Sequence, residues 1–280
     1  MLSKPDVFIG SECSYEDAKI VMFSAPFDGT TTFRPGTRFA GKAIRADSFG
    51  IESYSPYQDM NLYDMPFIDI GDLELPFGDT NRVLDLIEGQ VSQILENDKK
   101  PFMVGGEHLV TLGAIRAMVK AYPDLHILHL DAHADLRDDF LDEKYSHATV
   151  MRRIWDIIGD SKIYQAGIRS GDQDEFEFAK SHTVMHRYNL EEMDKHIAAL
   201  KGKPVYFSLD LDVLDPSVFP GTGTPEPGGV TFQELHQAVL MLKNLNIVGC
   251  DVCELSPHYD SSGISTAAAC KIIREILMVV

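Results

Sequence analysis

Short runs of hydrophobic residues, separated by longer amphipathic stretches, constrain the fold of this chain more than any other feature. Runs rich in Val, Ile and Phe occupy residues 20–23, 102–104, 126–130, 163–166, 205–209 and 247–252. A strand that lacks polar alternation is buried on both faces, as in a parallel sheet with helices on each side. The runs therefore predict an α/β protein of three layers, with a central, mostly parallel sheet and helices on both faces.

The stretches between these runs carry hydrophobic residues at helical spacing. The clearest stretch ends near Asn97 and aligns five side chains on one helical face: Leu84, Ile87, Val91, Ile94 and Leu95. Further helices are expected after four other positions: Leu109, Ala148, Phe232 and Ile264. No Ser/Gly-rich linker, charge block, repeat or shift in composition divides the 280 residues, so we expect a single domain over residues 1–280.

Polar clusters follow four of the hydrophobic runs, at the point where each strand would end. They occupy residues 105–108, 131–135 and 210–212, together with Glu254. The carboxyl ends of parallel strands meet at one edge of a sheet, where open α/β sheets bind their ligands. We therefore expect these clusters to converge on a single site.

Side chains at three of these strand ends have the chemistry of a metal centre: His108, Asp131, His133, Asp135, Asp210 and Asp212. Alternate residues of an extended chain point to the same side, so the aspartates and histidines of each cluster can face one centre. Four carboxylates gathered without Lys or Arg would repel one another unless cations lie among them. Six side chains are too many for one tetrahedral zinc but suffice for two bridged ions, and oxygen-rich ligation favours Mn²⁺.

The overall composition limits the kinds of partner. A formal net charge of −18 argues against nucleic acid, which requires clustered Lys and Arg. The same charge suits metal ions or a small cation, although by itself it also serves solubility. The sequence has no apolar stretch long enough for a signal peptide or a membrane span, and its four cysteines do not form a disulfide framework. We expect a cytoplasmic protein without a membrane partner.

Several smaller features receive structural interpretations. Cys250 and Cys253 have C-x-x-C spacing, but residues three apart in a strand point to opposite faces, so neither a disulfide nor a shared metal is expected. Asp215 is expected to cap the turn at Pro216. His126 and His129 lie within a hydrophobic run, which predicts that they are buried or support the site. The glycine-rich segment 221–229 lacks the G-K-[ST] ending of a phosphate loop.

Several motifs resemble those of the arginase/agmatinase ureohydrolase family. They are GGEH at 105–108, DAHAD at 131–135, SLDLDVLDP at 208–216, GTGTPEPGG at 221–229 and Glu254 in ELSP. The resemblance runs from about Pro35 to the C-terminus. It implies an arginase-like fold with the metal site at the C-terminal strand ends. It also implies two Mn²⁺ ions per subunit and a metal-bridging hydroxide that attacks a guanidinium carbon and releases urea.

The resemblance also implies a role for each site residue. Asp131 and Asp210 would bridge the two ions, His108 and Asp135 would complete one ion, and His133 and Asp212 would complete the other. Asp135 would in addition orient the hydroxide and carry its proton. Glu254 would bind the guanidinium group, and His147 would shuttle protons to the departing amine.

Arg137 bears on which guanidine is hydrolysed. It stands where arginases have an asparagine that helps to hold the substrate carboxylate, and in this it resembles a bacterial agmatinase branch. Two orientations are open: Arg137 could pair with a substrate carboxylate in the pocket, or it could turn outward to Asp138, Asp139, Asp142 or Glu143. The dense acids of this loop favour the outward orientation and suit a cationic substrate. We therefore predict an agmatinase, which converts agmatine to putrescine and urea in polyamine biosynthesis.

Other functions remain as alternatives. A related guanidine hydrolase would act on aminopropylagmatine, guanidinobutyrate, arginine or formiminoglutamate. A deacetylase of related fold would use one zinc ion, which six intact ligand positions argue against. A non-catalytic metal-binding scaffold would be favoured by the loss of a ligand, of His147 or of Glu254, and all are present. The resemblance further implies a homo-oligomer, either a trimer or a hexamer.

Overall fold

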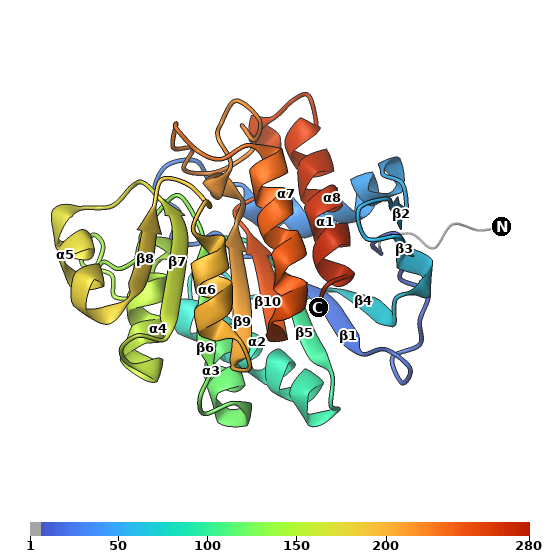
Figure 1. Cartoon of the computed structure of the whole chain (residues 1–280), viewed down its shortest axis with the longest axis horizontal. Helices are drawn as coiled ribbons and strands as arrows, with labels where there is room; N and C mark the ends of the chain where they lie inside the picture. Colours follow the sequence, from blue (N-terminus) through green and yellow to red (C-terminus); the bar gives the residue numbers. More distant parts are fainter. Residues whose placement is uncertain (1–6) are drawn as a thin grey trace.

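A parallel β-sheet lies at the centre of the computed structural model, which describes residues 7–280 (Figure 1). Its eight strands are β1 Ile20–Ala25, β4 Phe67–Asp72, β5 Lys100–Gly105, β6 His126–Leu130, β7 Ile163–Ile168, β8 Val184–Arg187, β9 Pro204–Asp210 and β10 Asn246–Cys253. They lie in the order β4-β1-β5-β10-β9-β6-β7-β8, and every neighbouring pair is parallel. A separate antiparallel pair consists of β2 Tyr54–Ser55 and β3 Met60–Asn61. Residues 1–6 of the predicted single domain lie outside the described residues.

Helices cover both faces of the sheet. They are α1 Ala40–Asp47, α2 Thr80–Glu96, α3 Val110–Ala121, α4 Val150–Ile158, α5 Gln173–His182, α6 Met193–Leu200, α7 Phe232–Met241 and α8 Ile264–Leu277. Buried side chains of α1, α6, α7 and α8 form one hydrophobic core with the sheet, and those of α2, α3, α4 and α5 form a second core. Figure 1 shows α6, α7 and α8 together in front of the strands. The three-layer architecture predicted from the hydrophobic runs is confirmed.

Two cysteines show how the strands separate these cores. Cys250 belongs to the core that includes α8, whereas Cys253 belongs to the core that includes α2 and α3. Both thiols are free and buried, as predicted from their spacing. Burial raises the pKa of each thiol well above its usual value, so both remain protonated. The polar side chains inside these strands, such as Ser208, Asp251 and His129, are hydrogen-bonded to one another or to residues at the strand ends.

The order and register of the strands bring the polar clusters together. Strands β5, β10, β9 and β6 are consecutive in the sheet. Leu130 pairs with Leu209, and Asp210 pairs with Cys253, so the carboxyl ends of β6, β9 and β10 are level. The residues that directly follow these strands therefore meet at one edge of the sheet.

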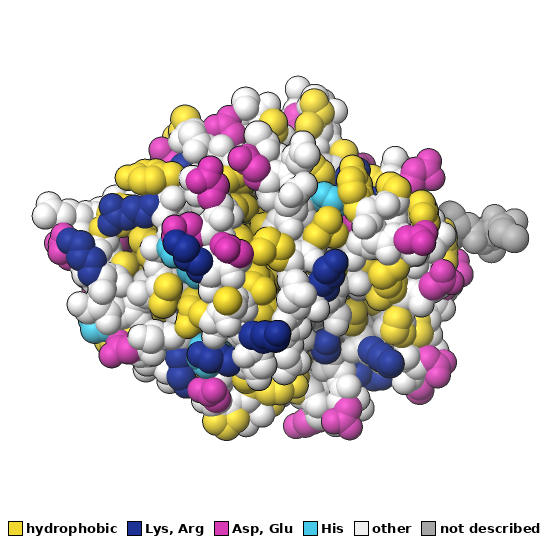
Figure 2. Space-filling view, viewed as in Figure 1, with side chains coloured by type: hydrophobic (Ala, Val, Ile, Leu, Met, Phe, Trp, Pro, Cys, Tyr) yellow, Lys and Arg dark blue, Asp and Glu magenta, His cyan; other side chains and the backbone are white. Residues whose placement is uncertain are grey.

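The surface carries charges of both signs. On the face shown in Figure 2, Lys and Arg side chains are interspersed with acidic and hydrophobic ones rather than gathered into one patch. Among residues 7–280, no helix combines the length and the apolar character needed to cross a membrane.

Candidate active site

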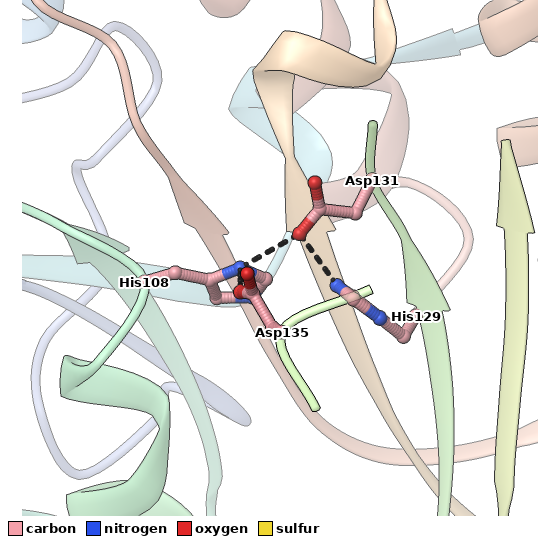
Figure 3. A group of neighbouring side chains, drawn as sticks. All are labelled: His108, His129, Asp131 and Asp135. Carbon is pink, nitrogen blue, oxygen red and sulfur yellow. Dashed lines mark hydrogen bonds and ion pairs between the residues drawn. The ribbon is translucent and has the colours of Figure 1, made fainter. Parts of the chain in front are cut away.

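One group of side chains surrounds the imidazole of His108, which follows β5. Its Nδ1 lies 3.0 Å from an oxygen of Asp131, 3.2 Å from one of Asp135 and 3.3 Å from one of Asp210. All four side chains are buried. Figure 3 shows His108 and Asp135 side by side, with the Asp131 carboxylate facing both His108 and His129. Three carboxylate oxygens around one ring nitrogen form a compact, acidic donor set.

A second group shares Asp131 with the first. His133 Nδ1 lies 3.0 Å from Asp212 Oδ2 and 3.6 Å from Asp131 Oδ1. Backbone N–H groups hold the other carboxylate oxygens, because Ala132 donates to Asp212 Oδ1 and Asp212 donates to Asp210 Oδ1. Asp131 thus lies between His108 and His133. All six predicted ligand residues come together, in two overlapping groups.

Hydrogen bonds fix which nitrogen of His108 faces the carboxylates. Ser208 donates its only hydroxyl proton to Asp251 Oδ1, at 2.7 Å. The Ser208 oxygen lies 2.9 Å from His108 Nε2, so it must accept the Nε2–H proton. In the neutral ring, Nδ1 then directs a lone pair toward three carboxylate oxygens. That arrangement requires a cation or a proton between them.

His129 contacts the same cluster but acts as a donor. Gln165 Nε2 donates to the carbonyl of Ala134 and lies 3.1 Å from His129 Nδ1. His129 Nδ1 therefore accepts, and Nε2–H donates to Asp131 Oδ2 at 2.8 Å. His129 supports the Asp131 carboxylate from within β6, as predicted for a histidine in that hydrophobic run.

The electrostatics of the cluster fit the presence of cations. Burial and the neighbouring Asp131 raise the pKa of Asp135 to about 7, and burial with nearby Asp212 and Asp131 raises the pKa of Asp210 well above its usual value. Burial lowers the pKa of His108, but hydrogen bonds to the three carboxylates outweigh it and raise the pKa well above its usual value. Within residues 7–280, no Lys or Arg forms an ion pair with these aspartates. Metal ions are the cations that such a donor set accommodates.

Glu254 directly follows β10 and lies beside His108. The backbone N–H of His108 donates to Glu254 Oε1 at 2.7 Å, and the side chain is buried with 5% exposed. Both Glu254 and Asp135 have left-handed backbone conformations, with φ of 67° and 55°. Non-glycine residues in this region are strained, and such strain concentrates at functional sites.

A cavity of about 210 Å³ opens above these carboxylates. Its lining includes His108, His133, Asp135, Asp210 and Glu254. The other lining residues are Thr32, Ala134, Arg137, Phe140, His147, Ala148, Ser170, Gly171, Glu175 and Thr224. The His147 ring packs against the edge of Phe140, with the ring centres 5.8 Å apart. Burial lowers the pKa of His147 to about 4, so this ring is neutral near neutral pH.

Known proteins with similar sequences identify the family of this chain. A model described as the Arginase family matches residues 18–279. The chain belongs to the arginase family. An agmatinase from Bacillus cereus is 46% identical to it over 277 residues, covering 97% of this chain and 95% of the relative. Together with two overlapping groups of side chains that could hold metal ions, membership in this family indicates a binuclear metal site.

Two further relatives differ in how similar they are to this arginase-family chain. The solved structure of a protein from Clostridium difficile is 49% identical, superposes with a TM-score of 0.92, and matches 95% of this chain and 99% of its own. An N(1)-aminopropylagmatine ureohydrolase from Thermococcus kodakarensis is 36% identical over 248 residues, covering 86% of this chain and 84% of the relative.

Arg137 has different partners from those predicted. Its Nη1 lies 2.8 Å from Asp172 Oδ2, and its Nε lies 3.4 Å from Glu175 Oε2. The predicted partners among the acids of its own loop were therefore wrong, and one of them, Asp138, pairs with Arg153 instead. Asp172 and Glu175 form the capping box of α5, a helix that the hydrophobic pattern did not predict. Arg137 remains part of the cavity wall, with its guanidinium already paired.

Asp215 organises the glycine-rich segment 221–229 of this arginase-family chain. Its Oδ1 accepts from Ser217 N at 2.9 Å, as expected for a cap of the turn at Pro216. Its Oδ2 accepts from the backbone N–H groups of Gly228 and Gly229. Hydrogen bonds from Ser217, with smaller contributions from these two glycines, lower the pKa of Asp215 to about 2. The segment in turn places Thr224, which donates to Asp212 Oδ2 at 3.2 Å. Asp215 lies at the surface, and it does not contact the metal cluster.

Neither Glu107, which lies within the polar cluster at 105–108, nor Thr30 was given a role from the sequence. Glu107 is fully buried beside His108, where burial raises its pKa to about 7. It accepts hydrogen bonds from Thr30 and Thr31. The segment that contains these threonines follows β1, so the same rule about strand ends could have identified it. This segment was not identified because Asp28 is its only acid and it contains no histidine.

Proposed function

We propose that this chain is an agmatinase, which hydrolyses agmatine to putrescine and urea. The observation that carries this proposal is a cavity with several buried carboxylates whose single arginine is already paired with Asp172 and Glu175. Such a cavity favours a substrate with positive charge at both ends over one that carries a carboxylate. The 46% identity to an agmatinase supports the same substrate.

Two Mn²⁺ ions are the proposed cofactors. His108 and Asp135 would hold one ion, His133 and Asp212 would hold the other, and Asp131 and Asp210 would hold both. When bound, the ions would supply Lewis acidity, which lowers the pKa of a water molecule toward neutral pH. The preponderance of carboxylate oxygens over imidazoles supports Mn²⁺ rather than Zn²⁺.

Glu254 binds the guanidinium group of the substrate. Its Oε1 is held by the His108 backbone N–H, and no group of the described residues donates to its Oε2. A carboxylate oxygen at the cavity wall accepts N–H bonds from a guanidinium and fixes the plane of the group. The reactive carbon is thereby oriented toward the metal ligands.

Two side chains move protons during hydrolysis. Asp135 accepts a proton from the attacking water, because its carboxylate lies in the cavity lining beside His108. His147 carries a proton to the nitrogen that departs as the amine of putrescine. The addition of one water to agmatine and the cleavage of one C–N bond then yield urea and the diamine.

The cellular setting belongs to the proposal as well. Putrescine formation from agmatine places the enzyme in polyamine biosynthesis. We propose that it acts in the cytoplasm as a homo-oligomer, a trimer or a hexamer, on the basis of its resemblance to the family.

Urea release tests this function directly. Protein stripped with a chelator and protein reloaded with Mn²⁺ are each offered agmatine, aminopropylagmatine, arginine and guanidinobutyrate. We expect urea chiefly from agmatine, with loss on stripping and recovery on addition of Mn²⁺. The variant Asp139→Asn is a control for loss of charge in the same loop as Asp135. Because Asp139 is exposed, we expect this variant to release urea at the normal rate.

Three other results would change the assignment. Urea from aminopropylagmatine in preference to agmatine would keep the chemistry and move the substrate toward that of the Thermococcus kodakarensis relative. Urea from arginine or guanidinobutyrate would show that the paired Arg137 does not exclude a carboxylate. No urea from any guanidine, with metal bound, would refute the proposed function.

A further inference from the structure

Glu107 is a buried carboxylate that no step of the proposed reaction uses. It lies between Gly106 and His108 and points away from the cavity toward the segment that follows β1. It accepts three hydrogen bonds there, from Thr30 N at 2.9 Å, from Thr30 Oγ1 at 2.6 Å and from Thr31 Oγ1 at 3.1 Å. A buried carboxylate with this many donors holds its partners firmly in place.

Thr30 connects Glu107 to His147. The backbone N–H of His147 donates to Thr30 Oγ1 at 3.1 Å, and His147 Nδ1 lies 3.4 Å from the same oxygen. A threonine hydroxyl has one proton, and when Glu107 is ionised this proton goes to Glu107 Oε1, at the shorter distance of 2.6 Å. Toward His147, the Thr30 oxygen can therefore only accept.

This accounting of protons fixes the tautomer of His147. We propose that Thr30, held by Glu107, is a positioning residue that keeps the His147 proton on Nδ1 and leaves Nε2 to exchange protons with the substrate. The hydrogen bond from the His147 backbone N–H to Thr30 fixes the backbone at His147, and Phe140 packs against the His147 ring. Thr30 lies outside the lining of the cavity and acts only through His147.

The inference rests on the proposed function, in which His147 carries the proton to the leaving amine. A ring with the opposite tautomer would present Nε2–H to the cavity without a lone pair to receive the next proton. Orientation of a catalytic imidazole by a fixed hydrogen-bond partner is a common requirement of proton transfer. Glu107 and Thr30 together satisfy this requirement.

Substitutions at Thr30 and Thr31 test the inference in the Mn²⁺-loaded full chain. Thr30→Val removes the hydroxyl with little change of shape, and we expect kcat for agmatine to fall about tenfold or more with KM and metal content unchanged. Thr30→Ser restores the hydroxyl and should return kcat to within about threefold of the original. Thr31→Val is the matched control, because it removes a bond to the same Glu107 carboxylate without touching His147.

A double-mutant cycle with His147→Asn tests the positioning role of Thr30 separately from the proton-carrying role of His147. If Thr30 acts through His147, Thr30→Val should change kcat by less than about twofold once His147 is replaced. If kcat falls in His147→Asn but is unchanged in Thr30→Val, this inference is overturned and the proposed function stands. Equal losses in Thr30→Val and Thr31→Val would also overturn it, because they would assign both threonines to the packing of the segment. Normal turnover by His147→Asn would remove the assumed proton carrier from the proposed function and the inference with it.

Discussion

At the scale of single residues, the site depends on hydrogen bonds that orient side chains before any ligand binds. Ser208 fixes the ring of His108, Gln165 fixes that of His129, and a backbone N–H fixes one oxygen of Glu254. Each of these bonds involves a buried group, so its loss would leave a polar atom without a partner. The side chains that we propose to hold the metal ions and the guanidinium group are thus kept in place by buried neighbours.

A substitution at Glu254 tests its role at this scale. Glu254→Gln keeps an oxygen that accepts from His108 N and removes the negative charge that attracts a guanidinium. We expect KM for agmatine to rise and kcat/KM to fall about 100-fold or more, because a charged hydrogen bond is replaced by a neutral one. Steady-state urea kinetics, together with the metal content of the purified variant, measure this.

The control for Glu254 comes from the neighbouring glycine-rich segment. Glu226→Gln neutralises a carboxylate that forms no ion pair among the described residues, and its kinetics should match those of the unmodified protein. A Glu254→Gln variant that binds agmatine normally would place the guanidinium elsewhere in the cavity. Loss of metal from this variant would instead assign Glu254 to the support of His108.

Arg137 shows what a sequence does not disclose about a single residue. Its charge and its place after the DAHAD motif were evident, but its partners are Asp172 and Glu175, more than thirty positions away in sequence. These two acids cap α5, whose weak hydrophobic pattern did not predict a helix. The sequence favoured an outward orientation because of the acids in the same loop, but Arg137 pairs with acids of α5 instead.

At the scale of elements, the interior strands were predictable and the edge strands were not. All six hydrophobic runs lie within β1, β5, β6, β7, β9 and β10. Within the eight-stranded sheet, the strands that were missed, β4 and β8, are its two edges. β4 carries Asp69, Gly71 and Asp72, and the four residues of β8 are only partly buried or exposed. Edge strands lack the double burial that produces a continuous apolar run.

The contact between α2 and α3 gives a prediction at the scale of elements. A Cβ added at Gly113 of α3 would lie 2.8 Å from Ile87 Cβ and 2.9 Å from the Leu84 carbonyl oxygen of α2. Gly113→Ala gains about 1 kcal/mol of helix propensity. Overpacking against a backbone atom typically costs about 1–3 kcal/mol, so we expect a net loss of stability. Thermal unfolding should show a midpoint lowered by a few degrees.

Gly89 provides the matched control for this substitution. It lies on the exposed side of α2, and a Cβ there would meet no atom within 4 Å. Gly89→Ala should therefore raise the thermal midpoint slightly, through helix propensity alone. If Gly113→Ala were as stable as Gly89→Ala, the two helices would have room to separate, and the close approach would not depend on glycine.

At the scale of the whole molecule, distant segments meet at one edge of the sheet. The rule that ligands bind at the carboxyl ends of parallel strands predicted that the four polar clusters converge, and they do. The strand order that makes β5, β10, β9 and β6 neighbours could not be derived from local patterns, because it depends on how the crossovers pack. For the same reason, Thr30 and Glu107 were not predicted as partners.

Gathering so many acids couples metal binding to the stability of the molecule. In the metal-free fold, burial and Asp131 raise the pKa of Asp135 from 3.8 to about 7. Between these values the folded chain holds a proton that the unfolded chain has released. Stability therefore falls as the pH rises through this window. A bound cation takes the place of the proton and favours the ionised carboxylate, which reverses the sign.

The prediction is that Asp135 makes the metal-free protein less stable as the pH rises. Asp135→Asn removes this titration, so the thermal midpoint of the chelator-stripped original chain should fall relative to that of the variant from about pH 5 to about pH 8. With Mn²⁺ in excess, the original chain should instead gain stability over the same range, since metal competes with protons for the carboxylates. Parallel midpoints of the two metal-free proteins across this range would show that Asp135 titrates at its ordinary pKa in the fold.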